Sequence, residues 1–596
     1  KAIEAGYIAP LINLGNLESG LGNFIAGNEY FERAFLELSN EGNYDLGLQI
    51  STLNGLTYNL ISIGDFGKSV NVGLNQLKLL EDKLEQDENP NKSYWLTKKG
   101  EALTNLGYSY FQLDSFDLAE EALSEALILI EKNYGTETYE FASALSSLSD
   151  VYFGTARTNL GIDTIKNAIG IVTRCCAHID ADVIAHYQTS LAYEYIKIGE
   201  HDKAETLLVS ANKLLKEQYT NFGQYNRIST LEQMTSLYLK KLEFGKAKEI
   251  AEEALFILKN QVENLNKLNL SSGSSIHALY ANVLFELDSS TLANNAFQAV
   301  QDNSDFALSK LINENSILGR SVIKSDINYF RKKREIMAKI VVVDGKFEQL
   351  RGETKSDFQK VEKVVTQKRK LKIELSELKR NFAKNNPDYA LIFNANPLSF
   401  IEVSTSLIDK EALFLTQFSD SLNYGLAFMI TKDDARAYKI DLSESDIADI
   451  VGELRADIDL SNSFGFGDLP NFDMDLSYDL YSKLFGPVED MLEGVKHLLV
   501  VPTGPLESLP LNLLVTEKPD IDPTASVFEN YQAAAWLPKT YSLTRLPSVS
   551  SLRALRVFAS EGQSQDPFIG FGDPVLDGPA GDLRGLTIED VYQGGE

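Results

Sequence analysis

A line of six residue types recurs along the first half of the chain at constant offsets. A large residue followed by a small one starts it, an aromatic residue comes at offset 4, and small, large and small residues come at offsets 13, 17 and 20. Starts of the line, including weaker copies, are Leu14, Asn54, Leu106, Leu148, Leu191, Met234 and Leu279. They lie 40, 52, 42, 43, 43 and 45 residues apart, so one structural unit repeats along this part of the chain.

Two antiparallel helices need such a line in order to pack closely. Gly or Ala on one helix lets the other approach, and large residues at helical spacing fill the groove between neighbouring pairs. The residue types at these offsets resemble those of the tetratricopeptide repeat (TPR), with a longer period that implies longer helices. We therefore predict a TPR-like α-solenoid of about seven repeats over residues 1–315.

Two short motifs within the predicted solenoid invite a chemical interpretation. Cys175, Cys176 and His178 follow the second helix of one repeat, where a half-buried structural cysteine is favoured over a reactive thiolate. The chain has only these two cysteines, which excludes a disulfide framework and a four-cysteine zinc site. Gly67-Lys68-Ser69 resembles the end of a phosphate-binding loop, but Ser62 stands where that loop needs its first glycine.

The charge of the chain is divided unevenly. With 56 Lys and Arg against 85 Asp and Glu, the net charge of −29 excludes a generally basic nucleic-acid binder. Residues 320–384 nevertheless hold 19 basic and 9 acidic side chains. Apolar residues at helical spacing predict a long helix from 353 onward, paired with an antiparallel helix over 323–343. This basic helical connector spans 316–385. Its densest run, Arg331, Lys332, Lys333 and Arg334, is either a solvated face or a dock for acidic surface.

After residue 386 the periodicity changes to that of a mixed α/β domain. Alternating segments over 413–418, 426–431 and 435–440 predict strands. An acidic helix over 444–459, a glycine-bearing loop over 461–470 and a helix over 477–484 follow. Continuous apolar runs at 497–501 and 568–572 are typical of buried parallel strands.

Several motifs of this region, in this order, resemble the CHAT domain, a caspase-like cysteine peptidase domain related to separase and usually preceded by tetratricopeptide repeats. They are Pro387-Asp388-Tyr389-Ala390-Leu391, Tyr481-Ser482-Lys483-Leu484-Phe485-Gly486-Pro487, the run from Leu498 to Pro510, and Leu546-Pro547-Ser548-Val549. The resemblance covers 386–596 and implies a caspase-like α/β fold.

The family pattern also implies a catalytic histidine in a His-Gly context and a catalytic cysteine in a Ser-Ala-Cys context, each after a later strand. No histidine follows His497 and no cysteine follows Cys176 in this sequence. Both are needed, because a neutral thiol is a poor nucleophile without a positioned base. We therefore expect an incomplete CHAT domain, with no catalytic residue among those printed; the alternative is a degenerate relative.

Two other constellations could carry chemistry. His497 and Ser508 lie eleven residues apart without a Gly-x-Ser-x-Gly elbow, so roles in core and turn are preferred. Asp468, Asp473, Asp475 and Asp479 lack the glycine of a calcium loop, so a solvated acidic loop is preferred. We predict neither a metal site nor a cofactor.

The resemblance implies a bacterial, TPR-regulated cysteine endopeptidase. The solenoid groove would hold a protein partner or regulator, and the peptidase would act on a protein substrate. The alternative is a non-catalytic scaffold for protein–protein interaction or self-assembly, including a homo-oligomer. No apolar run reaches the ~18 residues that a spanning helix needs, so we expect no membrane partner and a cytoplasmic location.

Overall fold

The computed structural model describes most, but not all, of the chain. The described residues are 5–20, 24–40, 46–85, 91–175, 181–218, 225–262, 270–288, 293–301, 358–385, 397–419, 421–458, 471–521 and 527–553, with isolated residues 329, 331, 332, 335, 336, 339, 343, 524 and 556. The predicted domain boundaries near 315 and 385 border segments outside this set, so both stay predictions.

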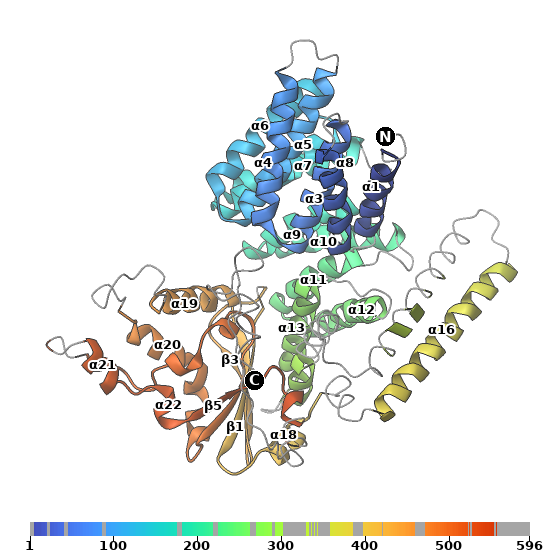
Figure 1. The fold of residues 1–596 in the computed structure, drawn as a ribbon. Helices are drawn as coiled ribbons and strands as arrows, with labels where there is room; N and C mark the ends of the chain where they lie inside the picture. Colours follow the sequence, from blue (N-terminus) through green and yellow to red (C-terminus); the bar gives the residue numbers. More distant parts are fainter. Residues whose placement is uncertain are drawn as a thin grey trace, which may run out of the picture.

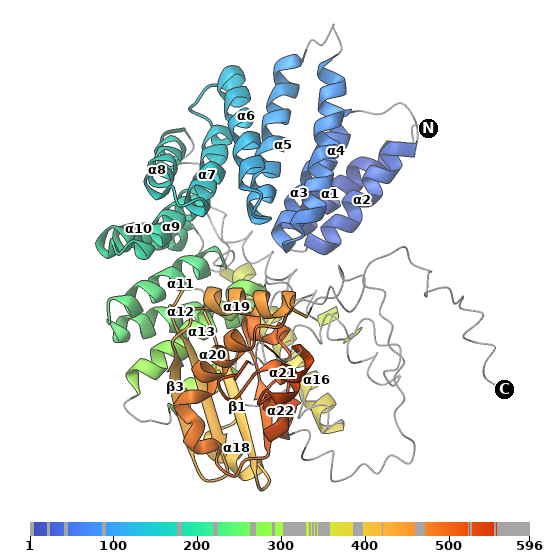
Figure 2. The ribbon, with the colours of Figure 1, turned by 90° about the vertical axis from the view of Figure 1, so that its left-hand side faces the viewer.

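Consecutive helix pairs make up the first half of the molecule and form an arc (Figures 1 and 2). Each predicted start of the repeat lies in the first helix of a pair. The helices are α1 (Ala5–Gly20), α2 (Phe24–Asn40), α3 (Leu46–Ile63), α4 (Phe66–Leu84), α5 (Lys92–Gln112), α6 (Phe116–Tyr134), α7 (Tyr139–Gly154), α8 (Thr158–Cys175), α9 (Ala181–Lys197), α10 (His201–Gln218), α11 (Tyr225–Lys240), α12 (Phe244–Val262) and α13 (Leu270–Leu287). Helical residues 294–301 follow α13.

Small residues of the repeat lie where its helices touch. A Cβ added to Gly107 on α5 would come within 2.5 Å of the Leu123 side chain on α6. Leu123 is fully buried there, as are Ala119 and Ala126 beside it. The small and large positions of the line are therefore the two sides of one helix–helix contact.

A left-handed residue closes the turn inside each of five pairs. These residues are Gly64 (φ +81°), Asp114 (+55°), Ala156 (+58°), Gly199 (+80°) and Leu242 (+58°). Only glycine adopts this conformation without steric cost, so Ala156 and Leu242 are strained. The helices that follow start at a fixed angle because the turn geometry repeats.

In the connector, one long helix is well described: α16 (Phe358–Asn385). Ile336 and Val343 pack against Leu371 and Leu375 of α16, and the ring of Tyr329 stacks on Phe382 with centroids 3.8 Å apart. The sequence-predicted pairing of two connector helices agrees with these contacts.

The C-terminal domain is built on a five-stranded sheet in the order β3-β2-β1-β4-β5. Strand β1 (Glu411–Gln417) pairs antiparallel with β2 (Gly425–Thr431), which pairs antiparallel with β3 (Ala435–Ile440). On its other side β1 is parallel to β4 (His497–Val501), which is parallel to β5 (Ser542–Arg545). The predicted strand at 568–572 lies outside the described residues.

Helices cover both faces of this sheet (Figure 1). Phe414 and Met429 face a core formed with α19 (Glu444–Ala456), α20 (Met474–Phe485) and the 3-10 helix η2 (Gly486–Leu492). On the opposite face, Leu415 and Phe428 pack with α18 (Phe400–Ser406), α13 and helical residues 294–301. The end of the solenoid is therefore one of the two layers that enclose the sheet.

The predicted fold class, an α-solenoid followed by an α/β domain, is confirmed. Among the described residues, no helix combines the length and apolarity needed to cross a bilayer.

Candidate functional site

The carboxyl ends of the parallel strands β1, β4 and β5 meet at one edge of the sheet. In open α/β sheets, ligands and reacting groups lie outside this edge. Here Thr503, just after β4, donates its hydroxyl to the Thr416 carbonyl at 2.8 Å, and the Thr503 amide donates to the Thr416 hydroxyl at 3.2 Å. These two bonds fix the start of the loop that leaves β4.

The loop continues into the 3-10 helix η3 (Gly504–Ser508). Gly504 has a φ of +58°, and a Cβ added there would lie 3.5 Å from Oε1 of Glu444, at the start of α19. Arg545, at the end of β5, donates to the Glu507 carbonyl at 2.5 Å. The edge is thus a shaped, polar surface formed by three strand ends and two helical segments.

Within the described part of the chain, this edge offers hydroxyl, carboxylate and guanidinium groups but neither a thiol nor an imidazole. Each of the Thr416 and Thr503 hydroxyls is hydrogen-bonded to a main-chain atom of the other residue, and neither of these contacts involves a general base. The absence of a catalytic residue from residues 1–596 therefore remains a prediction.

The structure separates His497 from Ser508. His497 opens β4 at the amino edge of the sheet, whereas Ser508 lies past its carboxyl end, about 13 Å or more away at ~3.3 Å per strand residue. The Ser508 hydroxyl donates to the Pro505 carbonyl at 2.9 Å. Ser508 therefore takes the turn role preferred from the sequence, whereas His497 is half-buried among polar partners and not in the apolar core.

A buried ionic cluster ties the amino edge of the sheet together. The Glu411 side chain is 2% exposed and pairs with the guanidinium of Arg556 and with Nδ1 of His497 at 3.1 Å. The other ring nitrogen of His497 hydrogen-bonds to Thr544 of β5 at 2.8 Å. Sequence reasoning missed this cluster, although a glutamate opening an otherwise apolar strand was a usable signal.

The acidic run of the sequence is explained by helix capping. Asp473 accepts the Leu476 amide at 2.8 Å and caps α20, so this helix begins earlier than predicted. Asp475 and Asp479 are exposed on α20, and Asp468 lies outside the described residues. A search of the described residues finds no group of three or more candidate metal ligands.

The solenoid motifs are likewise structural. Asp65 caps α4 by accepting the Lys68 amide at 3.2 Å, which places a carboxylate where a phosphate would bind. The Ser69 hydroxyl is buried against that of Ser109 at 2.8 Å. Cys175 is half-buried, as expected, and it is disulfide-bonded, which was not predicted from the sequence. Cys176 and His178 lie outside the described residues.

Aromatic rings join the end of the solenoid to the sheet. Phe297 is fully buried and stacks on Phe400 of α18, with centroids 4.6 Å apart and planes at 16°. Its ring also lies 5.4 Å from that of Phe428 on β2. A single side chain of the solenoid is thus shared by a helix and a strand of the α/β domain.

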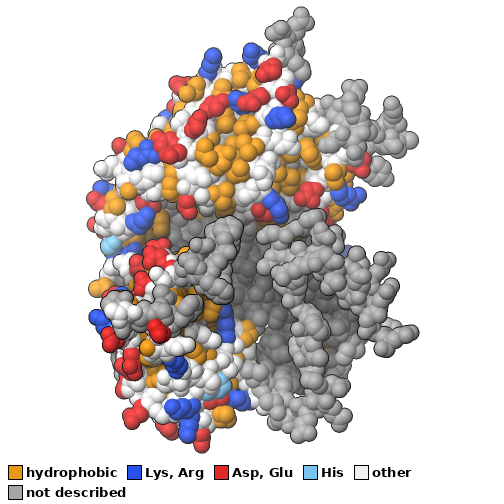
Figure 3. Space-filling model, turned by 60° about the vertical axis from the view of Figure 1, so that its left-hand side comes forward, with side chains coloured by type: hydrophobic (Ala, Val, Ile, Leu, Met, Phe, Trp, Pro, Cys, Tyr) orange, Lys and Arg blue, Asp and Glu red, His pale blue; other side chains and the backbone are white. Residues whose placement is uncertain are grey.

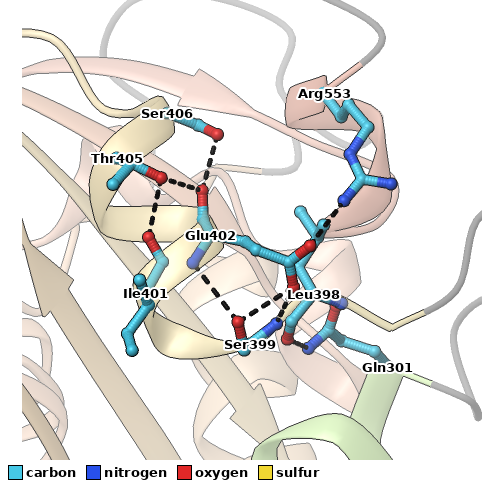
Figure 4. Close-up of polar contacts among 8 residues, drawn as sticks. All are labelled: Gln301, Leu398, Ser399, Ile401, Glu402, Thr405, Ser406 and Arg553. Atoms are coloured by element: carbon cyan, nitrogen blue, oxygen red, sulfur yellow. Dashed lines mark hydrogen bonds and ion pairs between the residues drawn. The ribbon is translucent and has the colours of Figure 1, made fainter.

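The side chain of one glutamine reinforces this junction through hydrogen bonds to the main chain of the α/β domain (Figure 4). Gln301 donates to the Leu398 carbonyl at 2.8 Å and accepts the Leu398 amide at 2.7 Å. Ser399 and Glu402 then form a capping box that starts α18, and Arg553 pairs with Glu402 at 3.0 Å. The position of α18 is therefore set from both the solenoid and the far end of the described chain.

A charged contact closes the junction at the other side. Lys439 of β3 pairs with Glu286 of α13 at 2.5 Å, and its Nζ lies 4.2 Å from the ring centroid of Tyr424. Tyr424 donates to the same carboxylate at 3.1 Å. Burial, together with the charge of Glu286, raises the pKa of Tyr424, so its hydroxyl stays a donor at physiological pH.

Comparison with protein families identifies one domain. The CHAT domain model matches residues 475–591, a range that contains three of the four sequence motifs of the resemblance. No curated protein matches the chain. The recognition of a TPR-like solenoid joined to a CHAT domain is thus confirmed.

Solved structures resemble the helical part. BtubC (BKLC) from P. vanneervenii is 18% identical over 36% of this chain and 82% of its own, with a TM-score of 0.30. A putative kinesin light chain with TPR-like repeats from Podosopora anserina is 13% identical over 37% and 99%, at 0.28. A Rap protein complexed with competence and sporulation factor is 12% identical over 63% and 99%, at 0.32.

Proposed function

Starting from a TPR-like solenoid joined to a CHAT domain, we propose that this protein is a caspase-like cysteine endopeptidase controlled by its solenoid. One observation carries the proposal: the end of the solenoid is a layer of the sheet whose carboxyl edge would bear the site. A partner held in the solenoid groove would shift α13 and residues 294–301, and Phe297 would pass that shift to α18 and β2. A bacterial, cytoplasmic regulated protease fits this arrangement.

The chemistry sets a requirement on the complete gene product. A thiolate forms at neutral pH only beside a base or cation, so a cysteine and a histidine must both reach the carboxyl edge. In the printed sequence both cysteines belong to the solenoid, and the last histidine lies at the opposite edge. The proposal therefore requires that both groups be encoded after Glu596.

The decisive experiment uses the complete gene product. Its mass and sequence should show a histidine and a cysteine after further strands, and replacing that cysteine by alanine should abolish cleavage of a co-purified partner. Cys175→Ala is the matched control, and it should leave cleavage intact. A gene product that ends at Glu596, or cleavage that survives loss of the downstream cysteine, refutes the proposal.

A second function, a non-catalytic scaffold, is favoured by a different observation. On the face shown in Figure 3, apolar side chains gather in a patch on the upper, solenoid half. Patches of this kind often mark protein–protein contacts. A scaffold would bind the same partner, or a second copy of the chain, without cleaving it, so partner capture with no cleavage by the complete product would decide for this function.

A further inference from the structure

The first helices of four consecutive pairs line a cavity of about 450 Å³ that is open to solvent. Phe111 of α5, Phe153 of α7 and Tyr193 of α9 supply aromatic walls. Asp150 of α7 and Gln233 of α11 are among its polar lining. The walls come from the regular stacking of the repeats, but these polar side chains are particular to this place in the solenoid.

Hydrogen-bond acceptors in this cavity are left without donors. Among the described residues, no hydrogen bond or ion pair reaches the Asp150 carboxylate, and Oε1 of Gln233 is buried without a hydrogen-bond partner. Burial, together with the nearby negative charge of Glu194, raises the pKa of Asp150 to about 7. Lys197 is engaged by Glu194 at 3.3 Å and does not neutralise Asp150.

Elsewhere the solenoid supplies such carboxylates with cations. Arg157 pairs with Glu120 at 2.6 Å, Arg174 with Glu137 at 2.7 Å and Arg227 with Glu253 at 2.5 Å. Arg227 and Glu253 lie on α11 and α12, whereas Arg157 and Glu137 lie in the turns that precede α8 and α7. The cavity around Asp150 differs because, among the described residues, its one lysine, Lys197, pairs with Glu194 and no cation pairs with Asp150.

We propose that this cavity binds the cationic side chain of a lysine or arginine that a protein partner presents. The Asp150 carboxylate and Oε1 of Gln233 are both acceptors, so a multiple donor such as ammonium or guanidinium satisfies them best. The aromatic walls suit the aliphatic stem and the face of the cation. Residues 1–315 hold 24 basic and 42 acidic side chains, which attracts a basic segment.

Binding is coupled to a proton. The groups that face Asp150 are Tyr108 of α5 and, on α9, Tyr187 and Glu194, with His186 and Lys197 lining the same cavity. A bound cation favours the ionised carboxylate, so Asp150 releases its proton on binding near pH 7. Burial lowers the pKa of His186, which is neutral at that pH; its protonation in acid opposes the cation as well.

The proposal rests on the proposed function only in that the solenoid receives a protein partner. Its test is isothermal titration of this chain with the N-acetyl methylamides of arginine, lysine and citrulline. Citrulline has the shape of arginine without the charge. We expect millimolar binding of arginine or lysine, at least tenfold weaker binding of citrulline, and affinity that falls as the pH drops from 7.5 to 5.5.

Matched variants assign the binding to this cavity. Asp150→Asn should weaken binding at least tenfold, whereas Asp163→Asn, at an exposed carboxylate of α8, should leave it unchanged. Gln233→Leu provides a second variant should Asp150→Asn change the melting curve. Equal binding of citrulline and arginine, or equal affinity of the Asp150→Asn and Asp163→Asn proteins, overturns the proposal. Cleavage by the complete gene product is measured separately, so either proposal can fail alone.

Discussion

The contact between Phe297 and the sheet yields the most demanding prediction about this molecule. Replacing Phe297 by alanine removes a fully buried ring that stacks on Phe400 and lies 5.4 Å from Phe428. Truncation of a buried phenylalanine costs ~3–5 kcal/mol, and each aromatic pair contributes ~0.5–1.5 kcal/mol of that. If the end of the solenoid is a layer of the α/β domain, the substitution should lower the free energy of unfolding of the sheet by this amount.

Two tryptophans allow the two parts to be monitored separately. Trp95 lies on α5 of the solenoid, and Trp536 lies in the α/β domain with its ring 5.6 Å from that of Phe472. In a Trp95→Phe background, urea unfolding followed by Trp536 fluorescence reports the sheet. Phe297→Ala should lower its midpoint by roughly 2 M, given a slope of ~2 kcal/mol per molar urea.

Phe31→Ala is the matched control, because this ring is equally buried but lies on α2 at the far end of the solenoid. It should leave the Trp536 transition in place, since repeats interact mainly with their neighbours. An unchanged Trp536 midpoint in Phe297→Ala would refute the reasoning. It would mean that the sheet is stable without the solenoid layer and that the proposed route of control does not exist.

Three further substitutions test other parts of the structure. Because burial raises the Asp150 pKa from 3.8 to about 7, the folded state holds this proton more tightly than the unfolded chain, and stability falls as pH rises between those values. Asp150→Asn should remove that dependence and raise the free energy of unfolding at pH 7.5 by ~2–4 kcal/mol, measured by urea titration at pH 5 and 7.5. Leu242→Gly should raise the free energy of unfolding by ~1 kcal/mol, and with it the melting temperature, because Leu242 is 73% exposed at a φ of +58°. Ile128→Gly, in the exposed interior of α6, should lower the melting temperature. Arg556→Met should cost ~3–5 kcal/mol in urea unfolding by stranding the buried Glu411, and Arg553→Met, at a more exposed pair, less than ~1 kcal/mol.

The solenoid was predictable because its packing rule is local. Gly107 and Leu123 are 16 residues apart in the chain, and the same pairing of a small with a large residue recurs in each repeat. Strand β4 was predictable because its burial leaves a continuous apolar run. Strands β1 and β2 were predicted from alternation, although the structure buries nearly every residue of both. In the solenoid, the contacting residues are close in sequence. In the buried strands, a residue needs apolar surroundings but no particular partner.

The remaining features depend on partners far apart in sequence. Glu411 and Arg556 are 145 residues apart, and Gln301 and Leu398 are 97 apart, so no local pattern announces either contact. Strand β5 was missed because its four residues are exposed or half-buried and show no periodicity. The open acceptors Asp150 and Gln233 were missed because they come from two different repeats, on α7 and α11.

The burial of the sheet explains why the solenoid and the α/β domain are joined so closely. Every residue of β1 is buried, which requires an apolar cover on each face. The α/β domain provides one cover from α19 and α20, and on the other face it contributes the seven-residue helix α18 together with Leu546, Val549 and Leu552. Phe297 and Val300, which complete the core on that face, belong to the solenoid. The stability of the sheet therefore depends on the position of the last solenoid helices. Any displacement of these helices exposes Leu415 and Phe428 to water, at a cost of ~25 cal/mol for each Å² of apolar surface.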